Sequence, residues 1–217
     1  MTGTSSHGSG THDFEVRGSH TVYEGAILAL RVDEVAMPGG RVAEREVVEH
    51  FGAVAMVARD DEGRIAMVRQ YRHPLGRRLL ELPAGLLDQG GESPVDAARR
   101  ELAEEADLSA DRWRLLVDLA SSPGFTDEAL RVYLAEGLHA VHAGERSDEE
   151  ADMTIEWVPT ADALRKVFAG DIVNATSVAG ILAIVAADLG EVELRAVDVA
   201  WRDEPTALRQ RKGAPST

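Results

Sequence analysis

The stretch that decides the fold is residues 81–108, ELPAGLLDQGGESPVDAARRELAEEADL. A turn signal at residues 83–85 is followed by a Gly-rich loop. Ser93 then stands where a helix N-cap belongs, and Pro94 occupies the first helical position. We therefore predict, in this order, a turn at residues 83–85, a loop, and a capped helix over residues 94–106.

This helix has two distinct faces when its residues are placed about 100° apart. One face is apolar and should contact a core, and the adjacent face carries Glu101, Glu104 and Glu105. Carboxylates four residues apart destabilise a helix by roughly 0.2–0.5 kcal/mol, and a bound cation would reverse that sign. Mg²⁺ binds through one or two carboxylates and completes its octahedron with water and substrate phosphate. The alternative is a solvated acidic face.

Turn, loop, capped helix and acidic cluster together resemble the Nudix box, G-x5-E-x7-R-E-U-x-E-E-x-G-U, in which U is apolar. The spacing from Glu92 to Arg100 is that of the family. The sequence departs at two places: the loop from Gly85 to Glu92 has one extra residue, and Asp107 replaces the last Gly. Asp is among the residues that tolerate a left-handed helix end. Neither departure removes a carboxylate.

The resemblance implies a divalent-metal site. By this resemblance Glu101 and Glu105 are the principal metal ligands and therefore catalytic residues. The backbone carbonyl of Ala84 would be a further ligand, and Glu104 would lie close by. The implied metal is Mg²⁺, with Mn²⁺ as an alternative.

Two further roles follow from the same resemblance. Glu92 and Arg100 resemble the ion pair that fixes the loop to the helix; the alternative is a surface pair worth about 0–1 kcal/mol. The carboxylate that activates water would come from a loop after the box, for which residues 147–152 are the matching stretch. We choose Glu150, with Glu149 as the alternate. The competing interpretation is an ordinary acidic surface loop.

The choice of substrate depends on Pro123, whose Ser-Pro-Gly-Phe setting resembles the ADP-ribose pyrophosphatase subgroup. Phe125 is the aromatic residue of that loop, and we expect it to contact substrate. By resemblance Arg45 and Glu46 would meet the adenosine end across a dimer, and Arg72 would meet the phosphates. The alternatives are a cross-strand pair for the first two residues and a solvated side chain for Arg72.

The implied activity is metal-dependent hydrolysis of the pyrophosphate of ADP-ribose to AMP and ribose 5-phosphate. Within the enzyme class, another ADP-sugar, GDP-mannose or a dinucleoside polyphosphate is an alternative substrate. A non-hydrolytic ADP-ribose-sensing module is an alternative from a different class, although such modules usually have an eroded box and an attached DNA-binding domain. An acidic scaffold protein has only composition in its favour.

Composition narrows the class of protein. The chain has 217 residues, of which 44% are hydrophobic and 28% charged, as in ordinary globular proteins. It has no run of about 18 apolar residues, so we expect no membrane span. Zero cysteines exclude disulfides and thiolate zinc sites, and a net charge of −15 argues against nonspecific nucleic-acid binding. The N-terminus lacks a secretory apolar segment, and we expect a cytoplasmic protein.

The pattern along the chain predicts four regions. These are a disordered tail at 1–18, strands at 19–48 that by resemblance are involved in dimer formation, a domain at 49–190 that by resemblance is a Nudix domain, and a C-terminal tail at 191–217, of which we expect the last 15 or so polar residues to be frayed. The N-terminal strands resemble those that ADP-ribose pyrophosphatases use to form homodimers.

Strands, helix, strands and then helices indicate an α+β or an α/β sandwich fold. The resemblance makes this an α/β/α sandwich with a mixed β-sheet between helices and an extra N-terminal antiparallel sheet. We expect Thr160 and Asn174 to cap the two late helices. The strands that we expect span 22–30, 31–37, 42–48, 54–58, 65–70, 113–120, 130–135 and 155–158, with the fourth and fifth forming a hairpin around residues 60–63.

Overall fold

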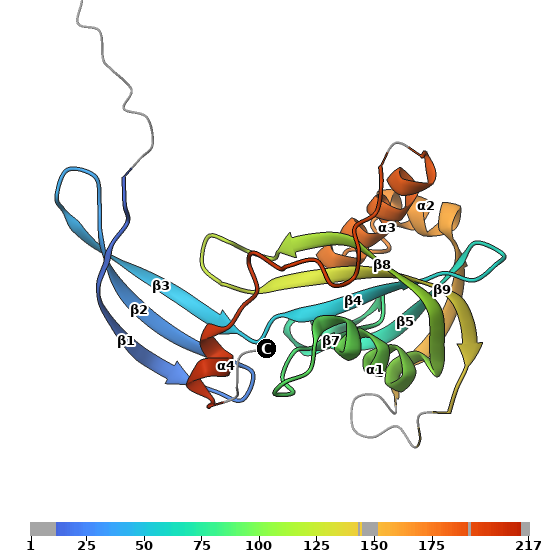
Figure 1. Cartoon of the computed structure of the whole chain (residues 1–217), viewed down its shortest axis with the longest axis horizontal. Coiled ribbons are helices and arrows are strands. Elements are labelled where there is room, and N and C mark those ends of the chain that lie inside the picture. Colours follow the sequence, from blue (N-terminus) through green and yellow to red (C-terminus); the bar gives the residue numbers. More distant parts are fainter. Residues whose placement is uncertain (1–11, 143, 145–151, 191, 214–217) are drawn as a thin grey trace, which may run out of the picture.

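The computed structural model describes residues 12–142, 144, 152–190 and 192–213. A small sheet lies to one side of a larger α/β body, and the C-terminal segment connects the two (Figure 1). Glu149 and Glu150 fall outside the described residues, so the structure does not test their predicted role.

The N-terminal sheet is antiparallel and contains three strands in chain order: β1 (Val16–Glu24), β2 (Leu28–Ala36) and β3 (Val42–His50). This confirms the extra sheet, but the bounds of the first two strands were wrong. The chain turns at Gly25, whose N–H donates to the Leu28 carbonyl at 2.9 Å, so a strand cannot continue through residues 22–30. β1 also takes up residues 16–18, which we had expected to be disordered.

The central sheet is mixed, as expected. Its order is β7-β4-β9-β8; β4 and β9 are parallel, and the other neighbours are antiparallel. Every residue of β4 is buried, which is typical of a strand covered on both faces. The strands span Ala53–Ala58 (β4), Ala84–Leu86 (β7), Leu108–Ala120 (β8) and Ala129–Ala140 (β9).

A second sheet contains β10 (Thr154–Pro159), β5 (Arg64–Arg72) and β6 (Arg77–Glu81) in that order, and the short 3-10 helix η1 (His73–Leu75) follows β5. The predicted hairpin between β4 and β5 is therefore wrong. The turn at 60–63 exists, but only an isolated bridge, Arg59 to Ile65, joins the two sides. Both edges of β4 pair with β7 and β9, and β5 pairs within the other sheet.

Helices cover both faces of the central sheet (Figure 1). Val54 and Met56 of β4 pack with α1 (Pro94–Ala106), whereas Ala55 and Val57 pack with α3 (Ala175–Asp188) and α2 (Thr160–Ala169). Successive strand side chains point to opposite faces, so one strand serves two cores. The α/β/α sandwich is confirmed. Among the described residues no helix is long and apolar enough to cross a membrane.

The caps of the box helix form as predicted. Ser93 Oγ accepts the Asp96 N–H, and Asp107 ends the helix in the left-handed conformation, with φ 51°. Asn174 likewise caps α3. Thr160 does not cap α2, because Pro159 takes that position and the Thr160 hydroxyl donates instead to the Gly63 carbonyl.

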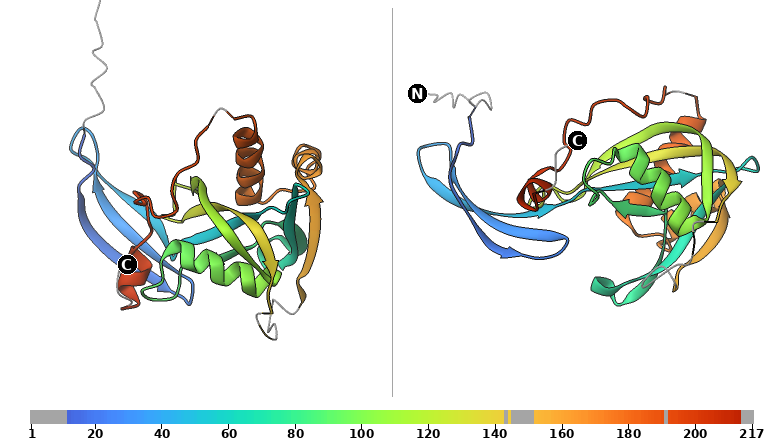
Figure 2. Two further views of the ribbon diagram at one scale, coloured as in Figure 1. Left: turned by 45° about the vertical axis from the view of Figure 1, so that its right-hand side comes forward. Right: turned by 60° about the horizontal axis from the view of Figure 1, so that its bottom comes forward.

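The C-terminal segment returns across the molecule and ends in α4 (Ala207–Arg211), which lies between the N-terminal sheet and the larger body (Figure 2). Leu208 is fully buried and packs with Ala29 and Phe51. The predicted frayed tail is therefore wrong for this stretch. The burial comes from contacts with residues far earlier in the chain, which local polarity did not reveal.

Candidate active site

The acidic face of α1 lies against the turn that precedes it. Glu105 is 5% exposed, and its Oε2 accepts the backbone N–H of Ala84 at 2.9 Å. Glu101 lies so close to Gly85 that a Cβ at that position would come 1.9 Å from the Glu101 Cδ. Residue 85 must therefore lack a side chain for the helix to pack on β7.

Burial changes the pKa of the Glu101 carboxylate. Desolvation raises its pKa, the nearby Glu104 and Asp88 charges raise it further, and Arg100 opposes them. Each of these carboxylates would be stabilised in its charged form by a nearby cation.

Arg100 holds the loop and the acidic face together. Its Nε and Nη2 donate to the two Glu92 oxygens at 3.1 and 3.0 Å, and Nη1 reaches Glu101 at 2.7 Å and Glu104 at 2.9 Å. These bonds, with Glu92 the largest contribution, raise the Arg100 pKa. The ion pair expected from the sequence is present, together with two contacts that the resemblance did not imply.

The donor set suits a hard divalent cation. In the described part of the chain no group of three or more His, Asp or Glu side chains is arranged to hold a metal ion by itself. Mg²⁺ needs no such group, because water and substrate phosphate fill most of its octahedron. Two adjacent carboxylates, Glu101 and Glu105, one of them desolvated beside further acids, fit that mode of binding.

A cavity of about 720 Å³ opens beside this turn. The turn at Ala84 and Gly85 lines one part of its wall, and Arg72 lines another part. Its remaining lining comes from segments far apart in sequence, including Ile27, His50, Ser121, Ser122, Glu128 and the first turn of α3.

Arg72 is held by a buried acid, Glu81, for which the sequence predicted no role. Its Nη2 donates to Glu81 Oε2 at 2.6 Å, and Gln70 donates to the same oxygen at 3.3 Å. Glu81 is 1% exposed. A charged residue inside the apolar run Leu79–Leu82 was the available signal, since a buried acid needs a partner.

His50 and Glu128 form a second polar group, a pairing that the sequence did not predict. His50 Nδ1 lies 3.4 Å from Glu128 Oε1 and 3.3 Å from the Gly52 nitrogen, while the His50 N–H donates to Asp127 Oδ1. Burial raises the pKa of Asp127. Nothing in the local sequence links residue 50 with residue 128, so only the fold brings them together.

The predicted adenosine contacts lie away from this cavity. Arg45 and Glu46 are exposed on β3, and Arg45 donates to the Glu44 carbonyl and to the Met37 sulfur. Neither lines the cavity described above, so one copy of the chain does not bring them to the acidic helix.

The loop that carries Pro123 and Phe125 borders the cavity through its neighbours Ser121 and Ser122. Phe125 is 58% exposed, and its carbonyl accepts the Val48 N–H at 2.8 Å. This bond fixes the loop to the end of the N-terminal sheet.

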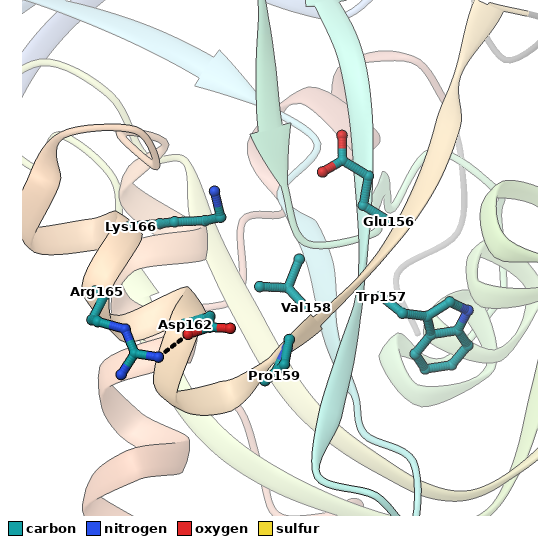
Figure 3. Close-up of a pocket in the computed structure, with 7 residues that line it drawn as sticks. All are labelled: Glu156, Trp157, Val158, Pro159, Asp162, Arg165 and Lys166. Atoms are coloured by element: carbon teal, nitrogen blue, oxygen red, sulfur yellow. Dashed lines mark hydrogen bonds and ion pairs between the residues drawn. The ribbon is translucent and has the colours of Figure 1, made fainter.

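A separate surface hollow of about 450 Å³ lies between β10 and α2 (Figure 3). Arg165 pairs with Asp162 there, and Trp157 and Val158 project from opposite sides of β10. None of the site residues expected from the sequence lines it.

Comparison with known protein families decides the family. The model of the NUDIX domain matches residues 49–176, more than half of the chain. The chain belongs to the NUDIX family. The model of the nucleoside diphosphate sugar hydrolase N-terminal domain matches residues 14–48, which contain β1, β2 and most of β3.

Curated relatives of this NUDIX protein include two ADP-ribose pyrophosphatases. That of Mycobacterium tuberculosis (strain ATCC 25618 / H37Rv) is 56% identical over 201 residues, covering 93% of this chain and 97% of the relative. That of Bacillus subtilis (strain 168) is 39% identical over 154 residues, covering 71% and 83%. A methanol dehydrogenase activator of Bacillus methanolicus is 42% identical over 134 residues, covering 61% and 72%.

Among solved structures, one described as an ADP compounds hydrolase superposes on this NUDIX protein with a TM-score of 0.74. It covers 83% of this chain and 96% of its own, at 21% sequence identity. At that identity the match establishes the fold.

Proposed function

We propose that this protein hydrolyses the pyrophosphate of ADP-ribose to AMP and ribose 5-phosphate in a Mg²⁺-dependent reaction. The observation that carries the proposal is the acidic face of α1, with Glu105 buried and Glu101 and Glu104 partly buried, beside a cavity that Arg72 also lines. The similarity over nearly the whole chain to a protein named ADP-ribose pyrophosphatase supports the choice of substrate. Mn²⁺ is the alternative metal.

In this proposal Glu101 and Glu105 hold the metal, with the Ala84 carbonyl beside them and Glu104 nearby. A bound divalent ion lowers the pKa of its water and neutralises phosphate charge. Arg72, oriented by Glu81, would bind the diphosphate as a fixed planar cation. Glu92 and Arg100 keep the loop in place. Together these groups fix the position of the phosphates relative to water, which is a large part of what such a reaction requires.

The proton of the attacking water needs a base, for which Glu150 is our proposal and Glu149 the alternate. Loss of a general base typically costs about 10²–10⁴ in rate. We expect Glu150→Gln to lower turnover by such a factor with little change in KM, since the carboxylate acts on the proton alone. Parent-like turnover in both Glu149→Gln and Glu150→Gln would move the search to Glu104 and then Glu128.

We also propose a homodimer formed through the N-terminal strands, with Arg45 and Glu46 of the partner subunit contacting the adenosine end and Pro123 and Phe125 bordering the site. Exposed apolar side chains on this sheet, such as Val22 at 57% and Tyr23 at 58%, support an interface there.

A cytoplasmic location remains our prediction.

A phosphatase-coupled assay tests the function. ADP-ribose has no terminal phosphate, whereas both proposed products carry one, so added phosphatase releases phosphate only after the pyrophosphate bond is cut. We expect phosphate release with Mg²⁺ and none with excess chelator. Binding of ADP-ribose without phosphate release would favour the sensing module instead.

A further inference from the structure

A buried arginine of the C-terminal segment has no role in the reaction described above. Arg209 of α4 is 2% exposed. Its Nη2 donates to the Leu87 carbonyl at 3.3 Å, and Nη1 reaches Glu204 at 3.2 Å. Its Nε has no hydrogen-bond partner within the part of the chain that the structure describes. A buried charge with incomplete hydrogen bonding costs free energy, which the contacts to Glu204 and Leu87 must offset.

The carbonyl that Arg209 binds lies where the box loop leaves the sheet. Pairing of β7 with β4 ends at Leu86, and the Leu87 N–H donates to the Gly52 carbonyl at 3.2 Å. Three residues before Leu87, the Ala84 N–H contacts Glu105. A shift of Leu87 would therefore be passed directly to the turn on which the acidic helix packs.

The box loop thus has an anchor at each end. Arg209 holds its beginning through Leu87, and the Glu92–Arg100 ion pair holds its end. Between them lie residues 88–91, and this loop is one residue longer than the Nudix pattern quoted above. A longer loop has more conformations available to it, which makes a second anchor more valuable.

α4, the helix that carries Arg209, is fixed in place by its own contacts. Leu208 is fully buried beside it, and Arg211 donates to Glu49 Oε2 at 2.7 Å. Pro205 contacts Gly52, where a Cβ would come 3.0 Å from the Pro205 Cγ. α4 therefore contacts both the N-terminal sheet and the start of the NUDIX domain (Figure 2).

We propose that Arg209 is a positioning residue for the metal site. By fixing the Leu87 carbonyl it holds the Ala84–Gly85 turn at the spacing that Glu101 and Glu105 require. The C-terminal segment thereby contributes to metal affinity without touching metal or substrate. This inference rests on the proposed metal-dependent function.

Arg209→Met tests the inference because Met keeps an unbranched apolar stem and removes the donors. Removing one partner of a buried ion pair is destabilising, so we expect a lower melting temperature, and the Mg²⁺ affinity of the folded variant is the measurement that decides. In calorimetric titration of the substrate-free full chain with Mg²⁺, we expect the Kd to rise at least about fivefold, since the turn loses an anchor. A purely structural Arg209 would lower the melting temperature in the same way and leave the Kd unchanged.

Two further variants complete the experiment. Arg209→Lys keeps one donor that can reach Leu87 and should give an intermediate Kd, which also decides the matter if the Met variant does not fold. Arg211→Met changes the same helix at a residue that does not contact the box loop, so it should lower the melting temperature and leave the Mg²⁺ Kd as in the parent.

Parent-like Mg²⁺ affinity in the folded Arg209 variants would overturn the inference. Failure of the parent to bind Mg²⁺ would instead refute the proposed function, and the inference with it.

Discussion

Glu105 has a structural contact and a proposed metal role, and a single substitution separates them. It accepts the Ala84 N–H, and in the proposed function its carboxylate also binds the metal. In Glu105→Gln the amide oxygen can still accept that hydrogen bond, but a neutral group is a much poorer ligand for Mg²⁺. We expect the melting temperature to stay near the parent's while turnover falls at least about a hundredfold, or ~2.7 kcal/mol. Unchanged turnover at saturating Mg²⁺ would refute the metal assignment.

Gly85 allows a second test at the residue scale. A methyl group at this position would overlap the Glu101 carboxylate, with a Cβ to Cδ distance of 1.9 Å. Gly85→Ala should therefore displace Glu101 and lower Mg²⁺ affinity and turnover together, by at least about tenfold in turnover. Gly18→Ala in β1 is the control, because the nearest atom there is the flexible end of Glu34 at 3.3 Å. Equal activity of the two variants would show that Glu101 can move without loss.

At the scale of elements, α4 and the N-terminal sheet are joined through Glu49. This carboxylate is 2% exposed, and the hydrogen bonds from Arg211 first and Arg31 next lower its pKa from the ordinary 4.5. The charged form therefore stabilises the fold above about pH 4.5, and this contribution disappears as the pH falls through the lowered pKa.

Glu49→Gln should accordingly reduce the free energy of unfolding at pH 7 by about 1–3 kcal/mol, as expected when buried charged donors lose their acceptor. The difference between parent and variant should shrink below pH 4.5. Denaturant titrations at pH 7 and at several acid values measure this, with the exposed Glu44→Gln on the same strand as control. A difference that does not depend on pH would mean that the ion pairs contribute nothing.

Among the elements, those set by local signals could be predicted from the sequence, and pairings between distant segments could not. The box helix was predicted with its caps because Ser93, Pro94 and Asp107 are local signals that act within one turn. The hairpin at 60–63 failed because the partners of β4 come from β7 and β9, and turn chemistry carries no information on them. α4 was missed because five residues are too few to show helical periodicity.

The same distinction between local and distant residues applies to the candidate site. The acidic cluster lies in one segment and could be located from spacing alone. The cavity wall that combines His50, Glu81 and Glu128 comes from three segments, and only tertiary structure brings them together.

At the scale of the whole molecule, the homodimer is the main prediction. Deleting residues 1–48 would test it poorly, because Ala29 packs with Phe51 and Leu208, and its removal would expose them. Val22→Asp is cleaner, since Val22 is 57% exposed and its change should barely affect the fold of one chain.

Sedimentation velocity should show the parent at twice the 23.4 kDa chain mass and the Val22→Asp variant shifted toward the monomer. Phe168→Asp, which alters a 79% exposed residue at the end of α2, should remain dimeric. A monomeric parent would refute the dimer, and a dimeric Val22→Asp variant would place the interface elsewhere.

The most direct test of the account is identification of the products from ADP-ribose, with other ADP-sugars, GDP-mannose and dinucleoside polyphosphates assayed alongside at equal concentration. With Mg²⁺ we expect AMP and ribose 5-phosphate in equal amounts, faster than any other cleavage in the set, and no reaction after chelation. Intact ADP-ribose in the presence of Mg²⁺, or faster cleavage of another compound, would contradict the account.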